Sequence, residues 1–301
     1  MQRSGDVPAV ARVPWGVRLS DLGYASALYE GVFGRPKAGE VRGVLTRQVH
    51  RTLWTRIIDR DMPSGARFYE NDIAVLVGVS RLPVRDAVAL LVEDGLLVRS
   101  GKGIQVRYFS PDEVRSLYDY RALLEGHAAS RAAAVLDAEA IESLRTEQAN
   151  LRREFEFARP EPRYVVDFLL ADLRLHDTIL AACANPNLMN AMRRIRGQLT
   201  LFQMDGMRRE EDVRAALDEH ELILRSLASK DAEGALSTMK QHILGLGNRV
   251  ATVLASETLG SGRGATDSNG TKEHTDSTHR ERNDIPGTGP HRGTGKEGAE
   301  S

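Results

Sequence analysis

The 301-residue chain contains a single cysteine, Cys183, and no long run of apolar residues. One cysteine excludes an internal disulfide framework and a zinc module built from several cysteines, so Cys183 is interpreted as a small core residue of a helix. No segment approaches the roughly 20 apolar residues that span a bilayer. The first residues also lack the charged start and apolar block of a secretory signal. These absences favour a cytoplasmic protein.

The sequence also lacks a strong overall charge, because its formal net charge is -1. The charge is nevertheless uneven along the chain. Residues 40–110 hold 11 Arg and Lys against 8 Asp and Glu, whereas residues 111–256 hold 19 against 23. A local excess of basic residues is what a phosphate-binding domain needs, but an excess of this size does not establish one.

Large apolar side chains are almost absent from the C-terminal segment, which from Thr258 to Ser301 consists mainly of Gly, Ser, Thr and charged residues. Such a segment cannot bury enough surface to offset its ordering entropy, so residues 257–301 are predicted to be a disordered tail. Residues 1–40 are rich in Gly and Pro and predict a flexible N-terminal arm, with a short helical piece around Tyr24–Tyr29.

Between these ends, residues 41–108 show a close succession of helix and strand signals. Apolar spacing predicts helices over 41–60, over 70–77 with Ile73, Leu76 and Val77 inward, and over 81–93 with Ser80 as the N-cap. Short strands are predicted at 96–99 and 104–108 around a glycine turn. This order indicates a winged helix-turn-helix. Every strong pattern from 111 to 256 is helical, which predicts a mainly α protein whose second domain is an antiparallel helical bundle.

The third predicted helix has the features of a DNA-recognition helix. Its inward positions follow helical spacing and are Val84, Ala87, Val88 and Leu91. Arg81 and Arg85 then lie one turn apart on another face, at the end of the helix that enters the major groove in this motif. Ser80 or the backbone amides beside it can bind phosphate. The alternative is a small helical core whose arginines are merely solvated.

Three stretches of this region, residues 65–74, 78–87 and 91–96, resemble the GntR family of bacterial regulators. The family form is a GVSRTPVREAL string followed by a glycine-containing wing. Carried over by position, the resemblance implies DNA contacts from the start of the third helix and from the wing, at Ser80, Arg81, Leu82, Pro83, Arg85, Gly101, Lys102 and Gly103. Leu82 replaces the usual Thr, and Asn71 replaces an Arg that some members use. A relative's operator sequence therefore cannot be assumed for this chain.

Four polar residues interrupt the apolar stripes of three helices in the second domain. They are Asp172 and His176, one turn apart, and then His220 and His242. A buried carboxylate or imidazole is costly unless it is paired. One Asp and three His form a ligand set that suits zinc first, and also nickel or manganese, and helical bundles hold such centres well. The alternative is a set of separate hydrogen bonds, such as Asp172 orienting His176 without a metal.

The second domain resembles FCD, the ligand-binding domain of the FadR subfamily of GntR regulators. The resemblance rests on residues 115–125, 172–177 and 184–186 and on the segments around the two later histidines. Many FCD members bind a divalent metal through an Asp-x-x-x-His pair and two later histidines. The resemblance therefore implies that Asp172, His176, His220 and His242 are metal ligands. The acyl-CoA-binding branch generally lacks this set, which argues against a fatty-acyl-CoA effector.

Arg121 is a further polar residue on an apolar helical stripe, that of Val114, Leu117, Leu124 and Ala128. A cation that faces a bundle core beside a metal could hold the carboxylate of a small organic acid, whose second oxygen would bind the metal. The alternative role of Arg121 is an ion pair with Glu125, one helical turn further on.

The function predicted from these features is sequence-specific transcription regulation, controlled by a small organic acid at the metal site. The expected partners are double-stranded operator DNA, a small carboxylate effector and a second copy of the chain, because two-fold dimers read paired half-sites. No catalytic residue is assigned.

Two alternative functions are a metal-dependent, hydrolase-like enzyme and a regulator whose metal is purely structural. In the enzyme, Glu219 or Glu221 would serve as the base. Adjacent residues on a helix point away from each other, so neither glutamate is expected to face the metal that His220 faces.

Overall fold

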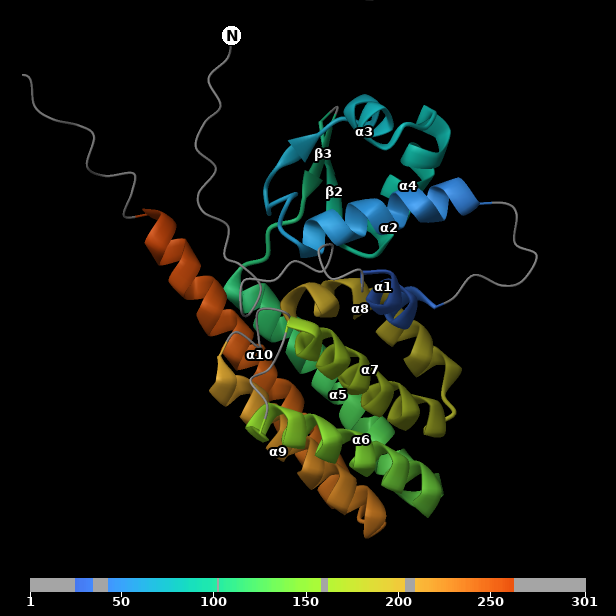
Figure 1. Ribbon diagram of the computed structural model, residues 1–301, viewed down its shortest axis with the longest axis vertical. Helices are drawn as coiled ribbons and strands as arrows, with labels where there is room; N and C mark the ends of the chain where they lie inside the picture. The colour runs from blue at the N-terminus through green and yellow to red at the C-terminus, as the bar shows by residue number, and fades with distance from the viewer. Residues whose placement is uncertain (1–24, 35–42, 102, 158–161, 204–208, 263–301) are drawn as a thin grey trace, which may run out of the picture.

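The computed structural model describes residues 25–34, 43–101, 103–157, 162–203 and 209–262. Within them the chain forms α1 (Ala25–Phe33), α2 (Val44–Ile58), β1 (Arg67–Phe68), α3 (Glu70–Val77), α4 (Arg81–Glu93), β2 (Leu97–Ser100), β3 (Gly103–Val106), α5 (Pro111–Val135), α6 (Ala138–Phe157), α7 (Pro162–Ala182), α8 (Pro186–Gln203), α9 (Glu210–Ala228) and α10 (Ala232–Gly262). Figure 1 shows α2, α3, α4 and the sheet as a small upper unit above the larger bundle of α5 to α10. The predicted mainly α fold is confirmed.

The upper unit is a winged helix-turn-helix whose core lies between α2, α4 and the sheet. Leu53, Trp54, Val84, Val88 and Leu91 are all fully buried there. The strands run antiparallel in the order β1-β3-β2, and the turn between β2 and β3 contains Gly101 at a φ of 60°. α3 and α4 have the predicted bounds, and Gly78 ends α3 with a φ of 70° that favours glycine.

Three details of this unit differ from the sequence prediction. Leu76, expected inward, is 56% exposed, and the buried residues of α3 are Ile73 and Ala74. In an eight-residue helix the apolar residues are compatible with two neighbouring rotations of the helix about its axis. The sequence pattern therefore could not determine which of them face the core. β1 was not predicted, because two residues are too short to show alternation. Ser80 holds the N-cap position of α4, but its side chain makes no capping hydrogen bond.

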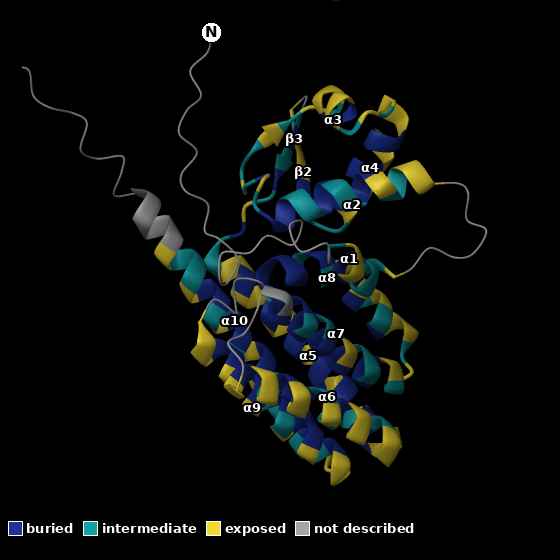
Figure 2. Cartoon of the chain, in the orientation of Figure 1, coloured by how far each residue is buried: buried dark blue, intermediate teal, exposed yellow. Residues whose placement is uncertain are grey.

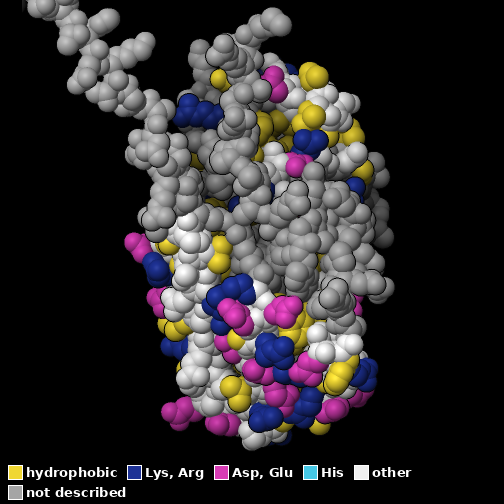
Figure 3. Space-filling model, turned by 60° about the vertical axis from the view of Figure 1, so that its left-hand side comes forward, with side chains coloured by type: hydrophobic (Ala, Val, Ile, Leu, Met, Phe, Trp, Pro, Cys, Tyr) yellow, Lys and Arg dark blue, Asp and Glu magenta, His cyan; other side chains and the backbone are white. Residues whose placement is uncertain are grey.

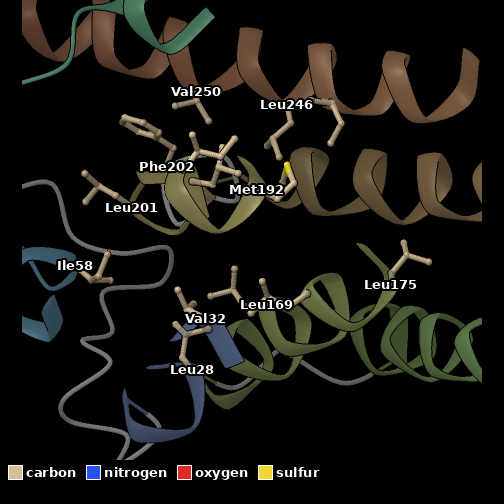
Figure 4. Packing of buried hydrophobic residues seen from close by; sticks show 14 of the residues in the cluster. Leu28, Val32, Ile58, Leu169, Leu175, Met192, Leu201, Phe202, Leu246 and Val250 are labelled. Carbon is tan, nitrogen blue, oxygen red and sulfur yellow. The ribbon is translucent and has the colours of Figure 1, made fainter. Parts of the chain in front are cut away.

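The predicted N-terminal arm contains a helix, and that helix is packed against the rest of the chain. In α1 the side chains of Leu28, Tyr29 and Val32 are buried. Figure 4 shows Leu28 and Val32 beside Leu169 of α7, and Gly31 allows α1 to lie close to two other leucines of that helix. The short helical piece predicted around Tyr24–Tyr29 overlaps α1, which continues to Phe33. Residues 1–24 and 35–40 of the arm lie outside the described residues.

The lower unit is an antiparallel bundle with a buried interior and an exposed exterior (Figure 2). α5 begins with a capping box in which Ser110 and Glu113 satisfy each other's backbone amides. α5 and α10 approach closely because Gly247 leaves room for Tyr118, whose Cβ would collide with a side chain at that position. Figure 3 shows acidic and basic side chains interspersed on the exposed face of the bundle.

The last helix is longer than predicted. α10 continues to Gly262, so the first six residues of the predicted tail, 257–262, are helical. Residues 263–301 of that tail lie outside the described residues. None of the described helices is both long enough and apolar enough to cross a lipid bilayer.

The two units meet where the end of α4 contacts α8. The side-chain amide of Gln198 donates to the backbone oxygen of Asp94 over 3.1 Å. Gly95, at a φ of 72°, lies against Gln198, and a Cβ there would overlap its amide. Phe33 of α1 lies beside Gly197 and packs its ring edge-on against Trp54. α1, α4 and α8 therefore converge at this junction.

Candidate metal centre and DNA-binding face

The structure places the four polar residues of the second domain together in the bundle core. Asp172 and His176 come from α7, His220 from α9 and His242 from α10, and each is at most 5% exposed. One ligand atom from each residue lies within 4.8 Å of the others. Oxygen and imidazole donors at such spacing suit one transition-metal ion.

Each of the three histidines is held from behind by a side-chain oxygen. His220 Nδ1 lies 2.9 Å from Gln148 Oε1, His242 Nδ1 lies 2.7 Å from Glu219 Oε2, and His176 Nδ1 bonds to Glu125. Because an ionised carboxylate can only accept, the Nδ1 atoms of His176 and His242 must donate. This arrangement leaves their Nε2 atoms to face the centre of the cluster.

The Nε2 atoms of all three histidines are buried without a hydrogen-bond partner. Two of them lie 3.5 and 3.3 Å from Asp172 Oδ1, longer than a good hydrogen bond to a carboxylate. Asp172 is itself oriented by Gln203, whose amide donates to Oδ2 over 2.6 Å. Unpartnered buried nitrogens are costly. A bound cation would satisfy all three, so the donor set fits a divalent metal.

The charges around the cluster also favour a cation. Burial would raise the pKa of Glu125, but Arg121 and His176 more than offset it and lower the pKa to about 2. Burial likewise opposes ionisation of Asp172, yet the neighbouring His176 and His220 hold its pKa well below the usual range. Burial would lower the pKa of His176, but Glu125 and Asp172 raise it to about 9. Without a metal, His176 therefore carries a proton at neutral pH.

His242 behaves differently from His176. Burial is the largest influence on it and lowers its pKa to about 4, although the hydrogen bond that its Nδ1 donates to Glu219 opposes the shift. Glu219 is held by a pair of hydrogen bonds from Arg249, of 3.0 and 3.1 Å. Its carboxylate is therefore committed to Arg249 and to the outer nitrogen of His242, and it is not among the clustered ligand atoms.

Arg121 forms the ion pair with Glu125 that was considered for it. It is 3% exposed, and its Nε donates to Glu125 Oε1 over 2.5 Å. Its Nη1 is buried without a hydrogen-bond partner. A cavity of about 20 Å³ adjoins this guanidinium and the cluster, lined also by Arg196, Thr200 and Gln203 of α8. A cavity of that volume has room for about one water molecule.

The predicted DNA-contact residues differ in their exposure. Ser80, Arg81, Leu82 and Arg85 are exposed at the start of α4, and Gly101 is exposed at the wing tip. Pro83 is buried in the first turn of α4, so it fixes the start of the helix and presents no surface to DNA. Gly103 is half-buried against Phe68 and Tyr69. Lys102 lies outside the described residues.

Sequence reasoning missed the partners of the histidines. Glu125 was considered only as a partner of Arg121, and Glu219 only as a catalytic base. Gln148 and Gln203 were not singled out, although both are 5% exposed. The available signal for Gln148 was its position: it is a polar residue on the inward face of a helix whose charged residues face outward.

A winged helix-turn-helix joined to a helical bundle is the architecture of a class of helix-turn-helix transcription regulators. Residues 45–106 match the family model of bacterial regulatory proteins of the gntR family, and residues 116–245 match that of the FCD domain. The chain belongs to the GntR family of bacterial regulators and carries an FCD domain.

Its relatives are transcription regulators as well. An uncharacterized HTH-type transcriptional regulator of Agrobacterium vitis is 36% identical over 126 residues, which cover 40% of this chain and 71% of that protein. The gluconate operon transcriptional repressor of Bacillus licheniformis is 24% identical, over 69% of this chain and 85% of its own length. The structure of E. coli McbR/YncC is similar with a TM-score of 0.55 at 20% identity, covering 71% of this chain and 98% of the other, which shows a shared fold.

Proposed function

We propose that this GntR-family regulator binds operator DNA with an affinity set by a small organic acid at a metal site in its helical domain. The observation that carries the proposal is the convergence of three unpartnered histidine Nε2 atoms and Asp172 beside the unpartnered Nη1 of Arg121. We assign residues 41–108 to DNA binding and 111–256 to effector binding and dimerisation.

The metal ligands in this proposal are Asp172, His176, His220 and His242. Three imidazoles and one carboxylate suit zinc first, with nickel or manganese as alternatives. A bound divalent ion would supply a Lewis-acidic point of attachment for an oxygen ligand. Glu125, Gln148 and Glu219 hold the imidazoles so that each presents Nε2 to the centre.

The acid would be held by its carboxylate on Arg121 as well as at the metal. The guanidinium uses Nε for Glu125 and keeps Nη1 for a second acceptor. Arg196, which also lines the cavity, is paired with Asp177 over 2.9 Å. One relative is a repressor of a gluconate operon, so gluconate belongs among the acids to be tested.

The size of the cavity supports a route from the acid to the DNA-binding unit. No organic acid fits about 20 Å³, so binding must displace the α8 side chains that line it. The same helix carries Gln198, which bonds to Asp94 at the end of α4. An acid that prefers the displaced arrangement of α8 would therefore change the placement of the recognition helix.

The active form in this proposal is a homodimer. A single recognition helix contacts few base pairs, whereas a two-fold dimer reads two half-sites about one helical turn apart or a multiple of that spacing. Light scattering on the full chain would give twice the mass of 33.2 kDa. A monomer at micromolar concentration that still binds a palindromic operator tightly would contradict this part.

The experiment is an operator titration of zinc-loaded protein with and without gluconate, citrate or lactate. At least one acid should change operator affinity severalfold in the natural chain and lose its effect in Arg121→Lys. Sorbitol, which matches gluconate in size but has no carboxylate, serves as the control in the same screen. If acids stabilise the protein against heat but leave operator affinity unchanged, the site binds acids without regulating DNA binding.

A further inference from the structure

The recognition helix presents an aliphatic side chain at the centre of its outward face. α4 buries Val84, Ala87, Val88 and Leu91 against the core of the DNA-binding unit. Successive residues of a helix are rotated by about 100° about its axis. Residue 82 therefore points in the direction opposite to the mean direction of these four buried side chains. Leu82 occupies this position and is 59% exposed.

The two arginines lie to one side of Leu82. By the same geometry Arg85 is about 60° from it and Arg81 about 100°. The Arg85 side chain is 63% exposed, and its Nε lies 4.0 Å from Oδ1 of Asp86. Both guanidiniums can therefore reach base edges or phosphates beside the position that Leu82 occupies.

Leucine cannot read DNA as its neighbours do, because it has no hydrogen-bonding atom. In the major groove the distinctive apolar feature is the C5 methyl group of thymine. A large apolar side chain at the middle of a polar contact surface gains free energy only if it meets such a group. Against cytosine or guanine, Leu82 would instead desolvate a polar base edge without bonding to it.

We propose that Leu82 reads the methyl group of a thymine next to the base pairs contacted by Arg81 and Arg85. The inference rests on the proposed DNA-binding role of α4 and adds a specificity to it. Leu82 makes the half-site require a thymine at one defined position, with the selection carried by its apolar surface and not by a hydrogen bond.

The test uses an operator selected from random duplexes by the full-length natural protein. Each thymine is replaced in turn by deoxyuridine, which removes only the methyl group and keeps the base pair. The proposal predicts one thymine per half-site at which this change weakens binding about fourfold, the factor expected for burying one methyl-sized group. Replacement in both half-sites should weaken binding about 15-fold, if the two effects are independent.

The same measurements on Leu82→Ala test whether Leu82 causes the dependence on the methyl group. In L82A the thymine and deoxyuridine operators should bind equally, since the apolar partner of the methyl group is gone. Leu90→Ala is the matched control, because Leu90 is exposed on the same helix about 12 Å further along its axis. L90A should keep the full methyl dependence.

The outcomes separate this inference from the proposed function. If no thymine shows a methyl effect, or if the effect persists in L82A, Leu82 does not read thymine although the protein still binds DNA specifically. If the natural protein selects no sequence at all, the DNA-binding proposal fails together with this one.

Discussion

Glu125 joins Arg121 to His176 through its two carboxylate oxygens in the core of the helical domain. Arg121 borders the small cavity, and His176 belongs to the candidate metal cluster. One buried carboxylate, 1% exposed, therefore connects the proposed anchor for an acid with a proposed metal ligand. Because of this connection, replacing Glu125 should disturb both the proposed acid anchor and the proposed metal ligand.

Replacing Glu125 with glutamine should weaken metal binding 10- to 100-fold, because His176 loses the carboxylate that orients its ring and raises its basicity. The affinity can be measured by competition with a chromophoric chelator. Glu147→Gln is the matched control, since Glu147 pairs with Arg174 on the surface of the same domain. Equal metal affinities for the two variants would show that Glu125 does not orient a ligand.

Metal binding at pH 7 should release one proton from His176. Its pKa of about 9 means that the metal-free protein carries that proton, which must leave Nε2 before a metal can bind. Calorimetry in two buffers of different ionisation enthalpy counts the proton. The apparent affinity should rise about tenfold per pH unit and level off above about pH 9. Binding without proton release would contradict the protonated state of His176.

The same pKa fixes the sign of a stability effect in metal-free protein. The pKa of His176 is higher in the folded chain than its ordinary value of 6.5, so protonation favours folding. This contribution is fully present below pH 6.5 and is lost as the pH rises through about 9. Urea unfolding of metal-free protein between pH 6.5 and 9.5 should show the loss, and His176→Gln should not show it.

Truncation of Leu28 tests whether α1 is an integral part of the fold. Leu28 is fully buried, so Leu28→Ala should lower the free energy of unfolding by about 2–5 kcal/mol. Leu123→Ala removes the same atoms from a residue that is 55% exposed and should change it by less than about 0.5 kcal/mol. Chemical denaturation compares them directly, and equal effects would mean that α1 is not packed in solution.

The hydroxyl of Tyr29 should contribute to the junction as well. Burial raises the pKa of Tyr29 to about 12, so its O–H stays protonated and donates to His50 Nδ1 over 2.8 Å. His50 Nε2 in turn donates to Asp94 over 3.0 Å. Tyr29→Phe leaves the buried His50 nitrogen unpaired and should cost about 1–3 kcal/mol of stability. The exposed Tyr120, changed to Phe, provides the control; a loss no larger than in that variant would contradict the role of the bond.

The arginines of α4 should carry much of the operator affinity. Each base contact of this kind is worth about 1–3 kcal/mol, so the Arg81→Ala, Arg85→Ala double variant should bind its operator at least 30-fold more weakly. Arg115→Ala, Arg131→Ala removes the same charge from exposed positions of α5 and should bind normally. Gel shifts at two salt concentrations measure the effect, and normal binding by the α4 variant would place the DNA contacts elsewhere.

The parts predicted from sequence are those that rest on regular spacing. Helical periodicity located α3 and α4 to the residue, and it set Asp172, His176, His220 and His242 on inward faces before any contact was known. Spacing within a helix does not say which helices face each other. The orienting roles of Glu125 and Gln148 depend on that arrangement and could be learned only from the structure.

Other features escaped because their causes are not periodic. A helical piece was predicted near α1, but its packing against distant helices was not, because local composition does not reveal it. The exposed Leu76 and the buried Pro83 depend on how a short helix is rotated against its neighbour. The small volume of the cavity beside Arg121 depends on side chains of α8 that lie far away in the sequence.

The central claim is that Asp172, His176, His220 and His242 hold one divalent metal ion in this regulator. The most direct test is elemental analysis by mass spectrometry of full-length protein that has been supplied with zinc and then dialysed, beside a His220→Gln variant whose circular dichroism confirms its helices. The account predicts one metal ion per chain in the natural protein and a stoichiometric loss in the variant. A natural protein that retains no metal, or a variant that retains as much, would contradict it.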